Sequence, residues 1–167
     1  MPPKSIGSLR KGIGHAAVAG EYERLADEDE QAARLLIEQH HYRHATYFVV
    51  QSMEKRVRHS IFSMVNAGQV YYRDQTRTHD LEDLLEFLIQ IVTADPITRT
   101  HVSDLLSNRV LGGHRFKTLH NNLRYPFYSD RDGAHCMLEI REQDACYALE
   151  LLQRLKEFLV DIPRLIK

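Results

Sequence analysis

The chain has 167 residues, of which 43% are hydrophobic and 27% charged, and its formal net charge at neutral pH is −1. This length suits one domain with a sizeable hydrophobic core. The small net charge excludes a global field that would draw the whole chain to nucleic acid or membrane, so any such affinity must come from a local patch.

The two cysteines, Cys136 and Cys146, lack the paired spacing of a zinc site and favour a reducing compartment. No apolar run approaches the ~18 residues that a membrane-spanning helix requires. The N-terminal stretch MPPKSIGSLRKGIG contains no apolar core of a secretory signal. We therefore expect a cytoplasmic protein with no membrane association.

The N-terminal half of the sequence predicts an arm followed by two helices. Residues 1–20 are rich in Pro, Gly, Ser and Ala and are predicted to be a flexible arm, in front of a helical domain over residues 21–167. A first helix is predicted over residues 22–40. A second helix is predicted over residues 42–66, where apolar side chains recur at every fourth position: Ala45, Val49, Met53, Val57 and Ile61.

The C-terminal half predicts three more helices. The third begins near Thr78 or Asp80, because Asp80 is a favourable N-cap, and it ends before Pro96. The fourth covers residues 97–111 and stops at two glycines. The last covers residues 140–160, with Pro163 just past its end.

No segment alternates polar and apolar residues with period two over a useful length, so no sheet is predicted. Residues 69–78 are expected to form a polar loop, and residues 114–133 to contain no more than one helical turn. The sequence therefore predicts an all-α fold, an up-and-down bundle of about five helices with short connections.

Three short motifs resemble those of one family. Tyr42-Arg43-His44-Ala45, followed by Gln51 and Glu54-Lys55, resembles the second helix of the HEPN (higher eukaryotes and prokaryotes nucleotide-binding) domain. Thr78-His79-Asp80-Leu81 resembles the start of that family's third helix. Arg124-Tyr125-Pro126 resembles a step that one bacterial branch carries before its last helix. The order of the predicted elements agrees over roughly residues 27–160.

The resemblance implies an HEPN-like helical bundle that is usually a homodimer and needs no cofactor or metal. Many members are metal-independent endoribonucleases of toxin–antitoxin or defence systems. Others are inactive RNA-binding or protein-interaction modules, and small bacterial members often pair with a nucleotidyltransferase antitoxin. We carry two alternatives: an RNA-directed protein of a bacterial toxin–antitoxin or defence system, or a non-catalytic dimeric module that binds a nucleotidyltransferase or another protein.

The resemblance implies that active members carry an Arg and a His with four to six residues between them. Six such pairs occur in this sequence, against roughly three expected by chance, so location must decide among them. Only Arg109 with His114 and Arg115 with His120 follow the third predicted helix. Of these, Arg115 would hold the scissile phosphate, and His120 would act as general base or acid. Both pairs lack the polar residue after Arg and the Tyr two positions after His that many catalytic members have, so an ordinary surface pair stays an alternative.

Residues 105–129 contain no Asp or Glu and combine cationic with aromatic side chains, a composition typical of single-stranded RNA surfaces. The alternative is a solvated loop whose aromatic rings close the end of the bundle. His40 and His44 would share a helix face but lack a clear third ligand, so no metal site is predicted. The candidate RNA-binding residues are Arg109, His114, Lys117, Asn121, Asn122, Arg124 and Tyr125.

Overall fold

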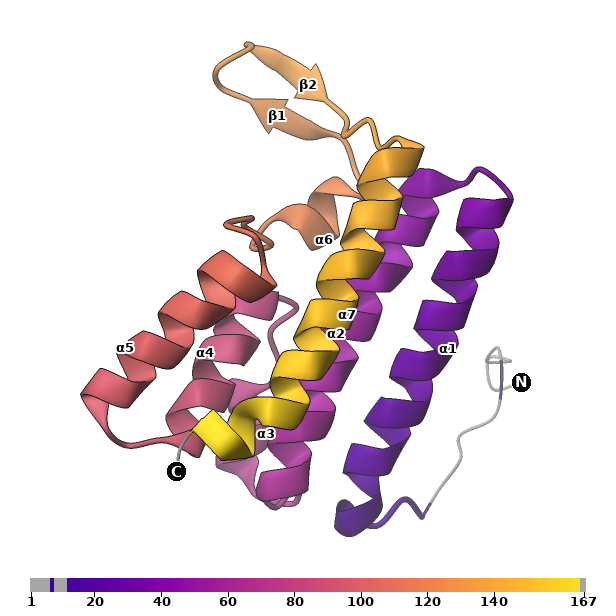
Figure 1. The fold of residues 1–167 in the computed structure, drawn as a ribbon. Helices are drawn as coiled ribbons and strands as arrows, with labels where there is room; N and C mark the ends of the chain where they lie inside the picture. Colours follow the sequence, from indigo (N-terminus) through magenta and orange to yellow (C-terminus); the bar gives the residue numbers. More distant parts are fainter. Residues whose placement is uncertain (1–6, 8–11, 166–167) are drawn as a thin grey trace.

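Two long helices, α1 (Val18–Glu38) and α2 (Tyr42–Met64), lie side by side and pack against each other (Figure 1). The computed structural model describes residue 7 and residues 12–165. Ala26 and Ala33 of α1 are fully buried, and their small side chains allow the two backbones to approach closely. The Ser52 hydroxyl of α2 donates to the Ala26 carbonyl at 2.8 Å. The chain reverses between the helices at His40, whose φ is 61°.

The remaining elements complete an all-α bundle with one small hairpin (Figure 1). A short turn, η1 (His15–Ala17), precedes α1. The later elements, in chain order, are α3 (Val70–Gln75), α4 (Leu81–Val92), α5 (Pro96–Leu105), η2 (Leu106–Val110), α6 (Leu119–Asn122), β1 (Phe127–Ser129), β2 (Ala134–Cys136) and α7 (Glu142–Leu165).

Helix α2 is the centre of the core, because it packs against α1, α4 and α7. The apolar stripe predicted for this helix is confirmed, since its five members are completely buried. The apolar face of α4, with Leu84, Leu85 and Leu88, and that of α7, with Leu152 and Leu155, belong to the same buried cluster. The helical spacing of the apolar residues therefore determines which faces meet.

The predicted start of α4 is also confirmed. The side chain of Asp80 caps the helix, and its Oδ1 atom accepts hydrogen bonds from the backbone N–H groups of Glu82 at 2.9 Å and Asp83 at 3.4 Å. The carboxylates of Glu82 and Asp83 lie in the first turn, where the helix dipole favours negative charge. The cap fixes where the preceding loop, which carries His79, joins the bundle.

Several short features differ from the sequence prediction. The loop predicted over residues 69–78 contains α3, and the fourth predicted helix divides into α5 and the π-helical η2. Pro163 lies inside α7, two residues before its last residue, and not past the end of the helix. Because Pro163 has no N–H, the hydrogen bond to the carbonyl of Leu159 is missing, but this loss falls in the last turn of the helix.

The expectation of no sheet is wrong in one place. Strands β1 and β2 pair antiparallel, with Tyr128 opposite His135, and form a hairpin that projects beyond the end of the bundle (Figure 1). Each strand has three residues, which is too short for an alternating pattern to be recognised in the sequence. Gly133, with φ of 60°, lies in the connecting turn.

The arm expected over residues 1–20 overlaps the helical part of the structure, because η1 begins at His15 and α1 at Val18. Residues 1–6 and 8–11 of that arm lie outside the described residues. Within residues 12–165, none of the helices combines the length and the apolarity that crossing a bilayer demands.

An ionic cluster around Glu30 of α1 joins three helices. Its carboxylate accepts hydrogen bonds from Arg34 at 2.8 Å, from Arg56 of α2 at 2.9 Å and from Lys156 of α7 at 3.0 Å. Burial opposes ionisation of Glu30, but the hydrogen bonds and the charges of these partners outweigh it and lower its pKa to about 2. The ionised carboxylate therefore stabilises the packing of α1 on α2 and α7.

We expect Glu30→Gln to lower the free energy of unfolding at neutral pH by about 1–2 kcal/mol, after allowance for solvent screening. Because the pKa of Glu30 is lowered on folding from 4.5 to about 2, this contribution is present above pH 4.5 and is lost as the pH falls toward 2. Urea denaturation of both proteins across this range measures it. Glu23→Gln, an exposed position on α1, is the control; a difference between wild type and Glu30→Gln that is independent of pH would contradict the assignment.

Candidate functional site

A buried carboxylate on α2 gathers side chains from two irregular segments. Glu54 is ionisable, yet it is only 2% exposed, because it lies beside the apolar stripe of α2. His79 comes from the loop before α4, and His120 comes from the short helix α6. One carboxylate oxygen of Glu54 and one ring nitrogen of each histidine lie within 4.8 Å of one another. The fold therefore joins groups that are far apart in the sequence.

The two oxygens of Glu54 face different histidines. Its Oε2 atom is 3.4 Å from Nδ1 of His79 and 4.0 Å from Nη2 of Arg58. Its Oε1 atom is 3.5 Å from Nδ1 of His120 and has no hydrogen-bond partner among the described residues. Burial raises the pKa of Glu54, while His79, Arg58 and Lys55 act in the opposite direction. The carboxylate thus has incompletely satisfied hydrogen-bonding capacity inside the protein.

The imidazole rings of His79 and His120 stack on each other, with centroids 4.9 Å apart and planes inclined by 13°. The side chain of His79 is 68% exposed, whereas that of His120 is 9% exposed. The ring of Tyr47 lies 5.6 Å from the ring of His120. One imidazole of the pair therefore faces solvent, and the other is enclosed by protein.

The surroundings of His120 favour its neutral form. Gln51 Nε2 lies 2.9 Å from Nδ1, and Arg124 Nη1 lies 3.3 Å from Nε2, so both ring nitrogens face N–H donors. A neutral imidazole can accept one hydrogen bond, whereas an imidazolium can accept none. Burial, followed by the charges of His79 and Arg124, lowers the pKa of His120. The ring therefore keeps a lone pair that can take a proton or bind a cation.

Arg124 is held between aromatic rings. Its guanidinium carbon lies 4.8 Å from the ring centroid of Tyr125 and 5.8 Å from that of Tyr47. The end of α6 is anchored to α2 by Arg43, which donates a hydrogen bond to the Leu123 carbonyl at 2.7 Å. The guanidinium of Arg124 thus lies at the protein surface, beside the buried imidazole of His120.

A groove opens beside this cluster, and its lining combines apolar side chains with four Arg and Lys side chains. Gln51, Glu54 and His79 lie at one part of it, and the other polar lining residues include His15, Lys55, Arg58, Arg73 and Arg77. Lys55 forms an ion pair with Asp29, and Arg58 donates hydrogen bonds to the carbonyl oxygens of Thr76 and Thr78. Arg73 and Arg77 are exposed, and Nε of Arg77 lies 3.6 Å from Oδ1 of Asp74. Because three of the four cations already contact carboxylates or carbonyls, a phosphate group here would meet chiefly the exposed Arg73.

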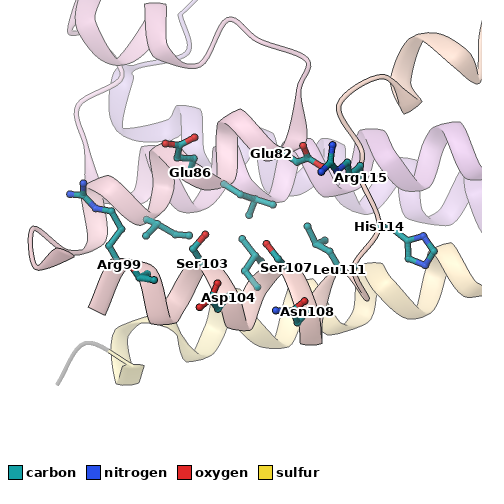
Figure 2. A pocket seen from close by; sticks show the side chains of 15 residues that line it. Glu82, Glu86, Arg99, Ser103, Asp104, Ser107, Asn108, Leu111, His114 and Arg115 are labelled. Carbon is teal, nitrogen blue, oxygen red and sulfur yellow. The ribbon is translucent and has the colours of Figure 1, made fainter. Parts of the chain in front are cut away.

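The structure brings together only some of the predicted site residues. His120, Arg124 and Tyr125 belong to the cluster. Arg115 and His114 are exposed and line a different groove, between α4 and α5 (Figure 2). Among the described residues, no hydrogen bond, ion pair or ring contact joins Arg115 to His120. The two residues do not lie on one continuous helix, because α6 begins only at Leu119.

The other predicted residues line neither of these two grooves. Arg109 is exposed on η2, and the exposed Asn121 accepts backbone hydrogen bonds from Arg124 and Tyr125 through its carbonyl. The half-buried Asn122 donates from its amide to the Thr118 hydroxyl at 3.5 Å. Lys117 is exposed, and its Nζ atom lies 4.0 Å from Oδ2 of Asp80.

The expectation of an acid-free cationic rim over residues 105–129 requires correction, because carboxylates from other segments reach it. Glu54 faces His120, Asp80 faces Lys117, and Oε1 of Glu82 accepts a hydrogen bond from the backbone N–H of Phe116 at 2.9 Å. These acids come from α2 and from the start of α4, which pack beside the segment. The charge of a surface depends on what folds against it, and the composition of the segment alone could not reveal these neighbours.

The sequence does not predict four members of the site. Glu54 and His79 belong to motifs of the family resemblance without a functional role assigned to them, and Gln51 and Tyr47 are not among the predicted site residues. One signal was present. Glu54 directly follows Met53 and comes three positions before Val57, so a carboxylate stands next to two members of the apolar stripe. A charged residue at the edge of a buried helix face needs an opposite charge or a hydrogen-bond partner, because burial of an unpaired charge is unfavourable.

We expect Arg124→Gln to raise the pKa of His120, because the substitution removes a neighbouring positive charge. The pKa should stay below the usual 6.5, since burial, the largest cause of the lowering, remains. Proton NMR titration of the His120 ring measures both values. Arg115→Gln is the matched control and should leave the titration of His120 unchanged; equal effects of the two substitutions would contradict the geometry described above.

Comparison with known proteins identifies one family. A family model described as HEPN domain matches residues 21–162, which is most of the chain. No significant match was found among the curated proteins or among the solved structures. The matched range begins within α1 and ends within α7, so it contains every member of the cluster around Glu54.

Proposed function

The chain belongs to the HEPN domain family, and from this membership and the geometry of its site we propose that it is an RNA-directed protein that cleaves RNA without a metal ion. The observation that carries the proposal is the position of His120. This imidazole is kept neutral beside the guanidinium of Arg124 and next to a second, solvent-facing imidazole, His79. These are the groups that cleavage through the ribose 2′-hydroxyl requires.

The proposed reaction is an intramolecular transfer of the phosphodiester. His120 takes the proton of the 2′-hydroxyl, the 2′-oxygen forms a bond to phosphorus, and the bond to the 5′-oxygen breaks. His79 gives a proton to the departing 5′-oxygen, which leaves a 2′,3′-cyclic phosphate and a 5′-hydroxyl. Arg124 stabilises the charge that develops on the phosphate oxygens. Glu54 positions the two imidazoles and does not contact the substrate.

The groove beside the cluster suggests where the RNA strand would lie. Arg73 and Arg77 line the same groove as His79 and could neutralise phosphates next to the cleavage position. The exposed ring of Tyr125, already stacked with Arg124, offers a surface for an unpaired base. This path favours single-stranded RNA over a rigid duplex.

The biological setting that we propose follows from the family resemblance. The protein would act in the cytoplasm as a homodimer, in a bacterial toxin–antitoxin or defence system, with a nucleotidyltransferase antitoxin as a possible partner. Nothing in the site requires the second subunit to contribute a residue, because His79, His120 and Arg124 come from one chain.

The second candidate function is a non-catalytic interaction module. Arg115 and His120 have the sequence spacing of the Arg and His that active family members use. In this structure the two side chains do not come together, which favours a protein without that activity. In that case the protein would bind RNA or a protein partner without cleaving RNA, and the buried cluster would serve stability alone.

Incubation of the purified protein with a single-stranded RNA in the presence of a chelator separates the two functions. We expect cleavage to a 2′,3′-cyclic phosphate, reduced at least about 100-fold in His120→Ala, His79→Ala and Arg124→Ala. His101→Ala, an exposed position on α5, is the control. Arg115→Ala decides between the two arginines, because loss of activity there, with Arg124→Ala unaffected, would return the site to the pair expected from the sequence. Absence of cleavage by the folded wild-type protein would favour the interaction module.

A further inference from the structure

The cluster around Glu54 contains a donor set that a transition-metal ion could use. Two imidazoles and one carboxylate face one another, and such a set is common for Zn²⁺. Oε2 of Glu54 lies 3.4 Å from Nδ1 of His79, and Oε1 lies 3.5 Å from Nδ1 of His120. In a tetrahedral zinc site with bonds of about 2.0–2.1 Å, neighbouring ligand atoms are about 3.4 Å apart, so each histidine already stands at that spacing from one of the two carboxylate oxygens. One ligand atom from each of the three side chains lies within 4.8 Å of the others.

A second observation points to a ligand. The Oε1 atom of Glu54 is buried without a hydrogen-bond partner among the described residues, and it faces His120. A buried carboxylate oxygen normally has such a partner, because removal from water without compensation is costly. A bound cation would supply the missing interaction. The neighbouring Ser52, buried on the same helix, shows the usual behaviour, since its hydroxyl donates to a carbonyl.

We propose that Glu54, His79 and His120 bind a single Zn²⁺ ion or a divalent transition-metal ion of similar preference, with water completing the coordination. Imidazole nitrogens favour Zn²⁺ and its neighbours in the transition series over Mg²⁺ or Ca²⁺, which prefer all-oxygen ligands. Each donor can bind without first losing a proton when the histidines are neutral and the carboxylate is ionised.

Binding requires two small local changes. The imidazole rings lie nearly parallel, whereas both lone pairs must point at one ion, so one ring has to turn. His79 can do this, because its side chain is 68% exposed and lies in the loop before α4. The amide of Gln51, whose Nε2 atom lies 2.9 Å from Nδ1 of His120, has to move aside. His120 and Glu54 can keep their positions.

The consequence for activity rests on the proposed function. An ion held by both imidazoles would occupy the groups that transfer protons, so Zn²⁺ would inhibit RNA cleavage and a chelator would restore it. The protein would then be a metal-independent nuclease that is switched off reversibly by a metal. Binding itself can be measured without any activity, so failure of the nuclease proposal would leave the metal site testable.

The test uses the full-length protein after treatment with a chelator and dialysis. Zn²⁺ is titrated in competition with a chromophoric chelator, and Co²⁺ is added separately because tetrahedral Co²⁺ gives intense visible absorption. We expect one equivalent of Zn²⁺ to bind, with affinity reduced at least about tenfold in His79→Ala and in Glu54→Gln. His101→Ala should bind as wild type does. His79→Ala is the decisive variant, since an exposed loop side chain can be removed without disturbing the core.

Two outcomes would overturn the proposal. One is the absence of stoichiometric Zn²⁺ binding by the wild-type protein. The other is binding that survives His79→Ala and Glu54→Gln but is lost in His44→Ala, which would place the ion at the histidines near the start of α2.

Discussion

The buried carboxylate of Glu54 is the constraint on which the site depends. A charge at this depth is unfavourable unless nearby groups compensate for it, and the compensating groups come from outside the apolar core. Arg58 lies on the same helix, but His79 and His120 belong to segments that contain little regular structure. The carboxylate therefore draws two otherwise loosely determined parts of the chain to one place. A glutamine could fill the same volume, but it could not offer a charge to both imidazoles.

Two arginine side chains of α2 also anchor the segments that carry His79 and His120. Arg43 binds the carbonyl of Leu123 at the end of α6, and Arg58 binds the carbonyls of Thr76 and Thr78 beside His79. Hydrogen bonds from a charged donor to carbonyls are among the stronger ones in proteins. One rigid helix thus positions both short segments, which allows a reactive cluster to be built from a loop and a single helical turn. The same arrangement suits RNA cleavage, in which His120 takes a proton and His79 gives one, and metal binding, in which both imidazoles offer a lone pair.

The sequence predicted the long elements well and the short ones poorly. Helices α1, α2, α4 and α7 carry apolar residues at helical spacing over several turns, and Asp80 marks the start of α4. In contrast, α3, η2 and the hairpin are too short for periodicity to develop, and tertiary packing decides their conformation.

The same distinction explains which parts of the site could be foreseen. His120, Arg124 and Tyr125 lie close together in the sequence, and basic and aromatic composition pointed to them. Glu54 and His79 approach His120 only in the folded chain, so no spacing rule could connect them. Arg115 has the expected sequence spacing from His120, but spacing has a geometric meaning only on a continuous helix, and the chain turns before α6.

The most direct test of this account is a long-range proton–nitrogen NMR spectrum of the histidine rings in the wild type and in Glu54→Gln. Such spectra report the hydrogen bonding of each ring nitrogen. If Glu54 holds both imidazoles, the substitution will change the Nδ1 signals of His79 and His120 together and leave those of the remote His101 as they were. Unchanged signals from both rings in a folded Glu54→Gln protein would contradict the central role of the carboxylate.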